Sequence, residues 1–459
     1  MNPRSFSNLP LSDAQLSNLE SLGYHNMTPV QVAALPGALA GDDLIAQART
    51  GSGKTAVFAL ALLARLELAS RDTQVLVLCP TRELSIQVST EVRRIVRHQQ
   101  NVTLTTLYGG QSVDLQKQAL KKGAQIVVGT PGRVADLVEK GSLLLKNLCM
   151  LVLDEADRML DMGFIKELKQ ITRVLPQKRQ TLLFSATYPD NIQELSSHLQ
   201  RDPKRISVEE AESSADIEQH MYRCKPENKL EGLKTLLLEH QPTSALIFCN
   251  FKQSTLDVRA FLRKAGFSAV ALNGDLDQRH REDILMLFKH QSCSILIATD
   301  VAARGLDIKD LPLVINYELP SGADTYVHRI GRTGRAGKQG VALSLCGERE
   351  LGKLAQINAY QKTALKAESL ETVRPKTTHI PRAANVTFSI SGGRKAKVRA
   401  GDILGALTGE GGIAGSQVGK IDVMDYMAYV AVQRAAATQA EQKLSTSKIK
   451  RRSFKIKKL

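Results

Sequence analysis

Residues 148–160 read LCMLVLDEADRML, and this stretch decides how the first part of the chain folds. An apolar run typical of a buried strand ends abruptly at Asp154, Glu155 and, after one alanine, Asp157. Charged groups are costly to remove from water unless they are paired or bind a metal ion. Three carboxylates at the end of a buried strand therefore need partners, which we sought in the rest of the sequence.

Similar apolar runs recur along the chain from residue 43 onward, separated by segments with helical periodicity such as 56–68. The expected strands are 75–80, 125–131, 148–155 and 181–187 in a first series, and 245–250, 269–274, 294–300, 311–318 and 341–345 in a second. This alternation is typical of parallel sheets covered by helices. The polar stretch 209–216 separates the two series, so we expect two α/β domains in tandem.

A different unit of about 79 residues follows the second polar stretch and shows the order β-α-β-β-α-β, which is typical of a ferredoxin-like or RNA-recognition-type fold. The expected boundaries are 1–208 for the first domain, 209–216 for a linker, 217–367 for the second domain, 368–380 for another linker and 381–459 for the third domain. The fold class is therefore α/β, with a small α+β domain at the end.

Composition narrows the class of protein. Of 459 residues, 43% are hydrophobic and 24% are charged, as in soluble globular proteins. The sequence contains neither a run of about 18 apolar residues, as in membrane spans, nor a start that resembles a signal peptide. The six cysteines are scattered singly, which argues against disulfides and zinc sites and favours a reducing cytoplasm.

Basic residues are concentrated in the third domain. The chain carries a net charge of +16, and residues 381–459 hold 15 lysines and arginines against 5 acids. A solvated surface needs no such imbalance, whereas a polyanionic partner does. The charge therefore indicates nucleic acid.

The stretch AQARTGSGKTAVF, residues 46–58, lies between an expected strand and an expected helix. Gly51, Ser52 and Gly53 allow backbone N–H groups to turn inward around a phosphate at the helix N-terminus. Lys54 is placed to meet the β- and γ-phosphates, and the Thr55 hydroxyl is placed to bind Mg²⁺. The usual pattern of such loops begins with Gly, where this chain has Ala48.

This loop explains the carboxylates of the opening stretch. A carboxylate at the end of a neighbouring strand holds the Mg²⁺ that accompanies nucleotide phosphates, and we assign Asp154 to this role. Glu155 is then positioned to orient and deprotonate the attacking water. Asp157 is expected to connect to another motif, the alternative being an ordinary solvated acid.

The DEAD sequence at 154–157 resembles the signature of the DEAD-box RNA helicases, and further motifs of that family follow in order. They are GYHNMTPVQ at 23–31, PTREL at 80–84, GG at 109–110, TPGR at 130–133 and SAT at 185–187. The resemblance covers residues 1 to about 365. It implies two RecA-like domains, hydrolysis of ATP with Mg²⁺ as cofactor, and RNA as substrate.

The resemblance also implies roles for individual residues on the nucleotide side. Gln31 would read the adenine edge, Phe6 would stack on the base, and Asp307 would lie near the ribose. The ATP-binding set is Phe6, Gln31, Ala48, Arg49, Thr50, Gly51, Ser52, Gly53, Lys54, Thr55, Gly305 and Asp307, with Thr55 and Asp154 as Mg²⁺ ligands.

Hydroxyls, bare N–H groups and guanidinium groups contact phosphates without reading bases. The resemblance implies that the RNA-contacting set in the core is Thr81, Arg82, Gly110, Thr130, Arg133, Gln278, Arg281 and Thr299. The alternative for Gly110 and Thr130 is that they only shape turns. Ser185 and Thr187, together with Asp157 and His328, would couple hydrolysis to unwinding; for His328 the alternative is a packed interdomain histidine.

The stretches ATDVAARGLD at 298–307 and HRIGRTGRAG at 328–337 carry the chemistry of the second domain. A guanidinium laid against developing charge stabilises phosphoryl transfer, and we expect Arg332 and Arg335 to have this role. The catalytic set is Lys54, Asp154, Glu155, Arg332 and Arg335. Because it is divided between two domains, we expect closure, promoted by ATP and RNA together, to precede hydrolysis and to separate short duplexes locally.

The third domain matches the usual RNA-recognition strand signature only in part, because 425–432 read DYMAYVAV. We therefore expect RNA to be held by the basic segments 392–402 and 448–459, and we single out Arg394, Lys395, Lys397 and Arg399. The stretch GGRKAKVRAGDILGALTGEGGI, followed by VGKIDV, resembles the C-terminal domain of the DbpA-type helicases.

That resemblance implies a monomeric, cytoplasmic enzyme that is directed to a hairpin of 23S ribosomal RNA and acts on pre-50S particles in ribosome biogenesis. Three alternatives stay open: a general RNA chaperone or clamp with broad targets, an RNA-binding scaffold with a vestigial ATPase, and a DNA helicase.

Overall fold

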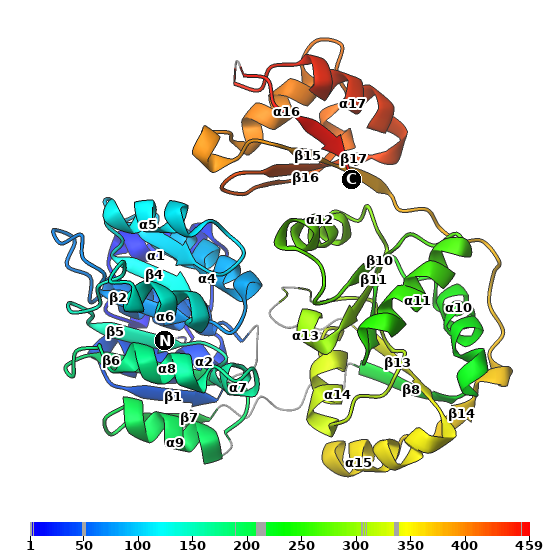
Figure 1. The fold of residues 1–459 in the computed structure, drawn as a ribbon, viewed down its shortest axis with the longest axis horizontal. Helices are drawn as coiled ribbons and strands as arrows, with labels where there is room; N and C mark the ends of the chain where they lie inside the picture. The colour runs from blue at the N-terminus through cyan, green and yellow to red at the C-terminus, as the bar shows by residue number, and fades with distance from the viewer. Residues whose placement is uncertain are drawn as a thin grey trace. The chain divides into compact units, whose positions relative to one another are not determined.

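The computed structural model describes residues 2, 4–47, 52–188, 190–207, 217–303, 306, 308, 310–334, 339–450 and 452–459 (Figure 1). The chain divides into two compact units. Residues up to Ala211 form the first unit, and nearly all residues from Glu212 onward form the second. The linker that we expected at 209–216 lies outside the described residues.

The first unit is built on a seven-stranded sheet in which every strand pairing is parallel. In sheet order, the strands are β3 (Leu104–Leu107), β4 (Ile126–Gly129), β2 (Val75–Leu78), β5 (Met150–Leu153), β6 (Gln180–Ser185), β1 (Leu44–Gln47) and β7 (Lys204–Ser207). The four strands that we expected here are confirmed. The outer strands β3 and β7 were not expected; they are as long as β2, β4 and β5, but their burial is incomplete.

Helices cover both faces of this sheet, because successive strand residues point to opposite sides. Val75 and Val77 of β2 belong to one apolar core, whereas Leu76 and Leu78 belong to the other. The helices are α1 (Asp13–Ser21), α2 (Pro29–Ala40), α3 (Lys54–Leu63) and α4 (Arg82–Ile95), then α5 (Val113–Lys121), α6 (Pro131–Glu139), α7 (Ala156–Asp161), α8 (Ile165–Thr172) and α9 (Asp190–Leu199). The expected helix 56–68 is therefore α3, which begins two residues earlier and ends five residues earlier.

The second unit contains a parallel seven-stranded sheet with the same topology. In sheet order, the strands are β10 (Ala269–Leu272), β11 (Ile295–Thr299), β9 (Ala245–Cys249), β12 (Leu313–Asn316), β13 (Gly340–Cys346), β8 (Ile217–Arg223) and β14 (Ala367–Ser369). The five strands expected from the sequence are all present. The two parallel sheets confirm the expected pair of α/β domains.

The helices of this domain are α10 (Lys229–His240), α11 (Lys252–Lys264), α12 (Gln278–Lys289), α13 (Asp300–Ala303), α14 (Ala323–Ile330) and α15 (Leu351–Gln361). The region 368–380, which we expected to be a linker, contributes to the domain. It contains most of β14, and Leu370, Val373 and Ile380 pack against the core under α10 and α11.

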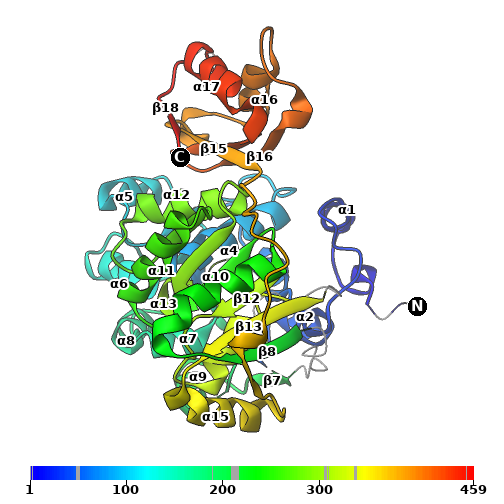
Figure 2. The ribbon, with the colours of Figure 1, turned by 90° about the vertical axis from the view of Figure 1, so that its right-hand side faces the viewer.

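The C-terminal domain has an antiparallel four-stranded sheet with two helices on one face (Figures 1 and 2). Its elements are β15 (Asn385–Ile390), α16 (Ala400–Thr408), β16 (Val418–Val423), β17 (Ala428–Gln433), α17 (Ala437–Thr446) and β18 (Ile456–Lys458), and the sheet order is β16-β17-β15-β18. This is the β-α-β-β-α-β arrangement that the sequence predicts.

Arg329 of α14 is fully buried and joins three strand ends of the second unit. Its Nε and Nη2 atoms donate to the two carboxylate oxygens of Asp300, after β11, at 2.7 and 2.6 Å. Nη2 also donates to Asn250 Oδ1, after β9, at 2.8 Å. Nη1 donates to Asn316 Oδ1 of β12 at 3.1 Å and to the Glu318 carbonyl oxygen at 2.8 Å. The guanidinium group therefore fixes the loops around the carboxyl ends of these strands.

Replacing this arginine is expected to destabilise the second unit. Removing one partner of a buried ion pair costs about 3–5 kcal/mol, and Arg329→Ala leaves Asp300 without its two donors. Denaturant unfolding, with hydrogen exchange of β9 as the local probe, measures this loss. Arg263→Ala on the exposed side of α11 is the control and should change stability by less than about 0.5 kcal/mol. A loss for Arg329→Ala as small as that of the control contradicts the assignment.

Candidate nucleotide and RNA site

The strand order of the first unit sorts the motif residues along one edge of the sheet. All seven strands run in the same direction, so the residues that follow them meet at the carboxyl edge. Asp154 follows β5, Ser185 ends β6, and Lys54 begins the helix after β1. Thr81 follows β2 and Thr130 follows β4 on the other half of the edge. The residues expected to bind nucleotide and those expected to bind RNA thus occupy different halves.

The phosphate loop is described from Ser52 onward; the expected contacts Ala48, Arg49, Thr50 and Gly51 lie outside the described residues. Gly53 precedes α3 with φ of 95°, in the left-handed region that favours glycine. A Cβ atom at this position would lie 2.5 Å from Gln31 Nε2. Glycine is therefore required here both by the backbone and by the close approach of Gln31.

Gln31 connects the start of α2 to the phosphate loop. Its Oε1 atom accepts a hydrogen bond from the Thr28 N–H group at 2.9 Å, and its Nε2 atom donates to the Gly53 carbonyl oxygen at 3.0 Å. The Thr28 hydroxyl donates to the Ser52 carbonyl oxygen at 2.7 Å. The adenine-reading residue suggested by the resemblance is thus in direct contact with the loop. Phe6 is 4% exposed and packs edge to face on another aromatic ring, Tyr24, so little of it is open to a base.

Lys54 and Asp154 form a buried ion pair, with 2.7 Å between Nζ and Oδ1. Burial raises the pKa of Asp154 above its usual range, against the effect of the Lys54 ammonium group. Burial lowers the pKa of Lys54, but Asp154 and Glu155 outweigh this effect and raise it. Lys54 is therefore protonated. The ionised form of Asp154 would be stabilised by a further positive charge beside it, in addition to the Lys54 ammonium group.

These residues fit a magnesium site completed by nucleotide phosphates. The Oδ2 atom of Asp154 is buried and has no hydrogen-bond partner among the described residues, so it is open to a further cation. The Thr55 hydroxyl lies in the first turn of α3, beside Lys54. In the part of the chain that the structure describes, no three His, Cys, Asp or Glu side chains converge as a metal cluster. Such a cluster is not needed here, since Mg²⁺ in phosphoryl-transfer sites takes few protein ligands.

Glu155 has an unusual backbone conformation, with φ of 56° and ψ of 54°. This left-handed conformation is uncommon for residues other than glycine and is often found at functional sites. The residue is 2% exposed, and its Oε2 atom accepts a hydrogen bond from Arg158 Nη1 at 3.0 Å. Glu155 follows Asp154, the residue expected to bind Mg²⁺, and its left-handed conformation lies at the start of α7.

Asp157 joins the DEAD sequence to the SAT sequence. Its Oδ2 atom accepts hydrogen bonds from the N–H groups of Ala186 and Thr187, both at 3.0 Å, and from the Thr187 hydroxyl at 3.1 Å. Ser185 Oγ donates to the Thr187 carbonyl oxygen at 2.6 Å. Asp157 is 8% exposed. It is thus placed as a link between two motifs rather than as a solvated acid.

The residues expected to hold RNA in the first unit surround the ends of β2, β3 and β4. Thr81 begins α4, where its hydroxyl accepts a hydrogen bond from the Leu84 N–H group at 3.2 Å. Gly110 has φ of 84°, and a Cβ atom on the preceding glycine would lie 3.2 Å from Arg82 Nη2. Arg133 Nη1 donates to Gln116 Oε1 at 2.8 Å. Arg133 Nη1 also donates to the Gln111 carbonyl oxygen at 3.3 Å, and the Thr130 N–H group donates to the Leu107 carbonyl oxygen at 2.9 Å. Arg82, Thr130 and Arg133 thus belong to segments next to the double-glycine turn.

In the second unit, the structure brings Arg281 and Thr299 together through one residue. Arg281 Nη2 donates to the Ala302 carbonyl oxygen at 3.4 Å, and Thr299 Oγ1 accepts from the Ala302 N–H group at 3.4 Å. Gln278, one turn before Arg281, donates to Glu282 Oε1 at 3.1 Å.

Arg332 and His328 lie near the end of α14. Arg332 is 7% exposed, whereas His328 is exposed. The expected residues Gly305, Asp307 and Arg335 lie outside the described residues. Arg329 was not singled out from the sequence. Its place between Arg332 and His328 in the HRIGR stretch was the available signal, but only the structure shows its partners.

The basic loop of the C-terminal domain is open to solvent. Arg394, Lys395, Lys397 and Arg399 are all exposed. The Arg394 N–H group donates to the Met424 carbonyl oxygen at 2.8 Å, and Arg394 Nε donates to the Val423 carbonyl oxygen at 2.9 Å, which hold the loop against the β16–β17 hairpin. By contrast, the aromatic ring of Tyr429 on β17 is fully buried, so it does not offer a stacking surface.

Among the described helices, none combines the length and apolar character that a membrane span requires.

Three protein families match consecutive parts of the chain. Residues 28–195 match the DEAD/DEAH box helicase family, residues 228–337 match the helicase conserved C-terminal domain, and residues 387–458 match the DbpA RNA binding domain. These ranges correspond to the two parallel-sheet domains and to the antiparallel C-terminal domain.

Whole proteins with the same organisation are also similar. The chain is 46% identical over 453 residues to the ATP-dependent RNA helicase DbpA of Escherichia coli (strain K12), which covers 97% of both chains. It is 37% identical over 474 residues to the ATP-dependent RNA helicase DbpA of Bacillus subtilis (strain 168), with 99% of both covered. Among solved structures, S. cerevisiae Dbp5 bound to RNA and ADP BeF3 is similar with a TM-score of 0.72 and 30% identity, over 80% of this chain and 96% of that one.

The three matched domains, in this order and over nearly the full length of both relatives, show that the chain belongs to the DbpA-type DEAD-box ATP-dependent RNA helicases.

Proposed function

We propose that this ATP-dependent RNA helicase is directed by its C-terminal domain to a hairpin of 23S ribosomal RNA and acts there during assembly of the large ribosomal subunit. The main support is the match of residues 387–458 to the DbpA RNA binding domain, combined with the exposed basic loop at Arg394, Lys395, Lys397 and Arg399. A domain that holds one RNA region raises the effective concentration of nearby helices at the helicase core. Pre-50S particles in the cytoplasm are the corresponding partner, and the enzyme acts as a monomer.

In the proposed reaction, Lys54 binds the β- and γ-phosphates of ATP, and Glu155 orients and deprotonates the attacking water. Arg332 and Arg335 of the second unit stabilise the charge that develops on the transferred group. Asp154 and Thr55 would hold Mg²⁺, which neutralises phosphate charge when it is bound. The buried, unpaired Asp154 Oδ2 atom supports this role. Gln31 reads adenine, Phe6 stacks on it through the small part of its ring that is exposed, Asp307 meets the ribose, and Ala48–Gly51 with Gly305 complete the nucleotide contacts.

The RNA strand would be held through its backbone by Thr81, Arg82, Gly110, Thr130, Arg133, Gln278, Arg281 and Thr299. Backbone contacts of this kind position RNA without reading its sequence. Since the catalytic groups belong to both units, hydrolysis requires the units to come together on ATP and RNA, and each ligand then favours binding of the other. Asp157, Ser185, Thr187 and His328 couple this step to local separation of a short duplex.

Glu155→Gln is expected to abolish turnover without abolishing binding. General base catalysis contributes about 100- to 10,000-fold to rate, so RNA-stimulated phosphate release should fall by about that factor, while ATP and RNA affinities stay unchanged. The neutral amide of glutamine still accepts the hydrogen bond from Arg158. Glu194→Gln on the exposed side of α9 is the matched control and should retain full activity. Turnover by Glu155→Gln at the parent rate would remove Glu155 from the catalytic set.

Asp157→Asn is expected to separate hydrolysis from unwinding. The carboxylate oxygen accepts three hydrogen bonds from the SAT segment, and a hydrogen bond to a charged group contributes about 1.5–3 kcal/mol. The number of duplexes opened per ATP hydrolysed should therefore fall by about 10- to 100-fold. Asp161→Asn, at the exposed end of the same helix, provides the control. If hydrolysis and unwinding decline in parallel, Asp157 has no specific coupling role.

Crosslinking the protein to total cellular RNA tests the proposed target. Adducts should be enriched on one hairpin of 23S ribosomal RNA, and the double variant Arg394→Glu with Lys395→Glu should lose this enrichment because two exposed cations are reversed. Lys420→Glu, an exposed lysine on β16, tests whether any charge change on the domain has the same effect. Adducts spread over all transcripts would instead favour a general RNA chaperone or clamp.

A further inference from the structure

The sheet of the C-terminal domain has a polar outer face. One row of this face crosses all four strands, because the register pairs Asp422 with Tyr429, Tyr429 with Ser389, and Ser389 with Lys457. The intervening residues, such as Phe388 and Val430, point to the other face and form the core under α16 and α17. In RNA-recognition domains the outer face is the one that stacks bases.

In this protein, α12 of the preceding domain covers part of that outer face. Tyr429 donates a hydrogen bond from its hydroxyl to Asp283 Oδ1 at 3.1 Å. At the other end of α12, Lys289 Nζ and His290 Nε2 lie 2.6 and 2.9 Å from the two carboxylate oxygens of Asp422. Burial pushes the pKa of Asp422 up, but the hydrogen bonds from His290 and Lys289 outweigh burial and lower the pKa to about 2.

These contacts replace base stacking with packing against protein. Tyr429 is fully buried, and the His290 side chain is inaccessible to solvent. The Ser292 and Thr387 hydroxyls also hydrogen-bond at 2.7 Å, again between the end of α12 and the sheet. The part of the outer face that carries Tyr429 is therefore not available to RNA. The part of this face that α12 leaves uncovered lies next to the first turn of α12, at Ser389 and Lys457.

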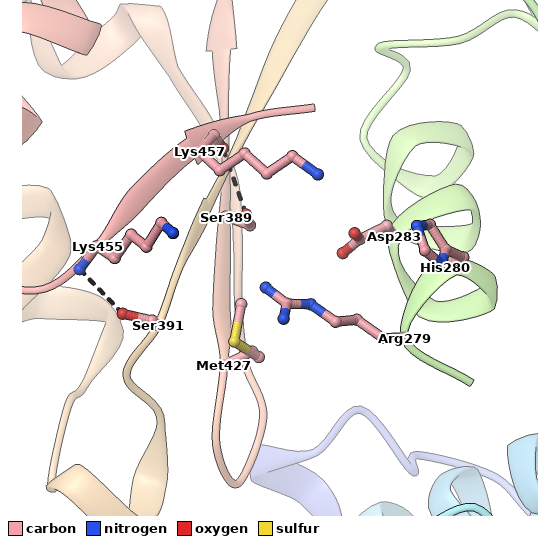
Figure 3. A pocket seen from close by; sticks show the side chains of 8 residues that line it. All are labelled: Arg279, His280, Asp283, Ser389, Ser391, Met427, Lys455 and Lys457. Carbon is pink, nitrogen blue, oxygen red and sulfur yellow. Dashed lines mark hydrogen bonds between the residues drawn. The ribbon is translucent and has the colours of Figure 1, made fainter. Parts of the chain in front are cut away.

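A cavity of about 360 Å³ lies at this place, between the start of α12 and the edge strand β18 (Figure 3). Arg279 and Asp283 reach it from α12, and Ser389, Ser391, Lys455 and Lys457 reach it from the C-terminal domain. The volume is in the range of small-ligand sites. It is large enough for part of a nucleotide.

Positive charge dominates the lining. Arg279, Lys455 and Lys457 are cationic, and Asp283 is the one carboxylate among the lining residues. Asp283 already accepts the Tyr429 hydroxyl. Within the described part of the chain, the charged ends of Arg279, Lys455 and Lys457 have no hydrogen-bond or ion-pair partner. Like charges that converge without partners repel one another, so an anion that binds among them is favoured.

The position of the cavity indicates which anion it takes. Arg279 lies on α12 between Gln278 and Arg281, both of which are proposed to contact RNA in the helicase core. Lys455 and Lys457 belong to the RNA-binding domain. A strand of RNA that leaves this domain and enters the core would thus pass along α12 and meet the cavity on its way.

We propose that this cavity is a binding site for the sugar–phosphate backbone of a single RNA strand, at the passage from the C-terminal domain to the helicase core. Arg279, Lys455 and Lys457 contact phosphate oxygens, and the Ser389 and Ser391 hydroxyls contact phosphate or ribose. Among the described lining residues there is no Phe, Tyr or Trp, and the His280 ring is held by Asp277, with 2.6 Å between Nδ1 and Oδ2. The contacts proposed here are therefore to the backbone and are independent of base sequence. The inference uses the RNA-binding role of the chain but not the identity of the ribosomal target.

The test compares two charge reversals in the full chain. Arg279→Glu combined with Lys457→Glu changes the cavity, and Arg263→Glu combined with Lys420→Glu makes the same charge change on exposed residues outside the cavity. Affinity for a uridylate homopolymer and for transcribed 23S ribosomal RNA is measured over a series of salt concentrations. The milder pair Arg279→Gln and Lys457→Gln removes the charges without reversing them.

The cavity variant is expected to bind both RNAs about tenfold more weakly than the matched control, since charge-assisted contacts are lost. The slope of log affinity against log salt should fall by about 0.7 for each phosphate contact removed. Equal slopes and affinities for the cavity variant and the control would overturn the proposal, provided that both variants unfold at the parent temperature. If the cavity variant unfolds earlier, the glutamine pair decides by the same criterion.

The two RNAs keep this proposal separate from that of the ribosomal target. A parent protein that binds 23S ribosomal RNA no better than the homopolymer contradicts the target. The comparison between cavity variant and control still decides the proposal for the cavity.

Discussion

Both large domains depend on one constraint, the common direction of the strands in each sheet. When every strand is parallel, the segments that follow the strands meet at one edge, and helices must occupy both faces to return the chain. The site residues of the first unit therefore come from positions as distant as Lys54 and Thr187, yet they lie along one line of strand ends. The strand order then separates the residues proposed to bind nucleotide from those proposed to bind RNA. No loop has to be long to achieve this.

The same edge creates a problem of buried charge, which the two units solve differently. In the second unit, Arg329 and Asp300 satisfy each other through two short hydrogen bonds, and neighbouring amide and carbonyl oxygens take the remaining donors. In the first unit, Asp154 faces Lys54 with one oxygen and keeps the other without a partner among the described residues. A fully satisfied pair holds loops in place, whereas an incompletely satisfied one has capacity for a ligand. This difference fits the assignment of ATP to the first unit.

The sequence predicted the parts of the structure that local pattern determines. Buried strands such as β5 are continuous apolar runs, so they were found. The phosphate loop has a fixed spacing of glycine, lysine and threonine, so the sequence alone predicts it between β1 and α3. Strands at the sheet edges were missed, because β3 and β7 are only partly buried and lack the continuous apolar run of the equally long β2, β4 and β5. The stretch 368–380 was expected to be a linker from its polarity, yet β14 pairs with β8 there. The partners of Arg329 and Tyr429 are distant in sequence, and no local pattern reports such contacts.

The packing of the C-terminal domain on α12 changes what this domain does for the helicase. A domain on a flexible tether only raises the local concentration of its RNA. The contacts of Asp422 and Tyr429 with α12 fix the domain to the element that also carries Gln278 and Arg281. If RNA is held by the basic loop, as we propose, it would be presented to the second unit in a defined direction as well as at high concentration. The Tyr429 ring, which could have stacked a base, is buried and hydrogen-bonded to Asp283 instead, which is consistent with the proposal that RNA is held by the loops of this domain.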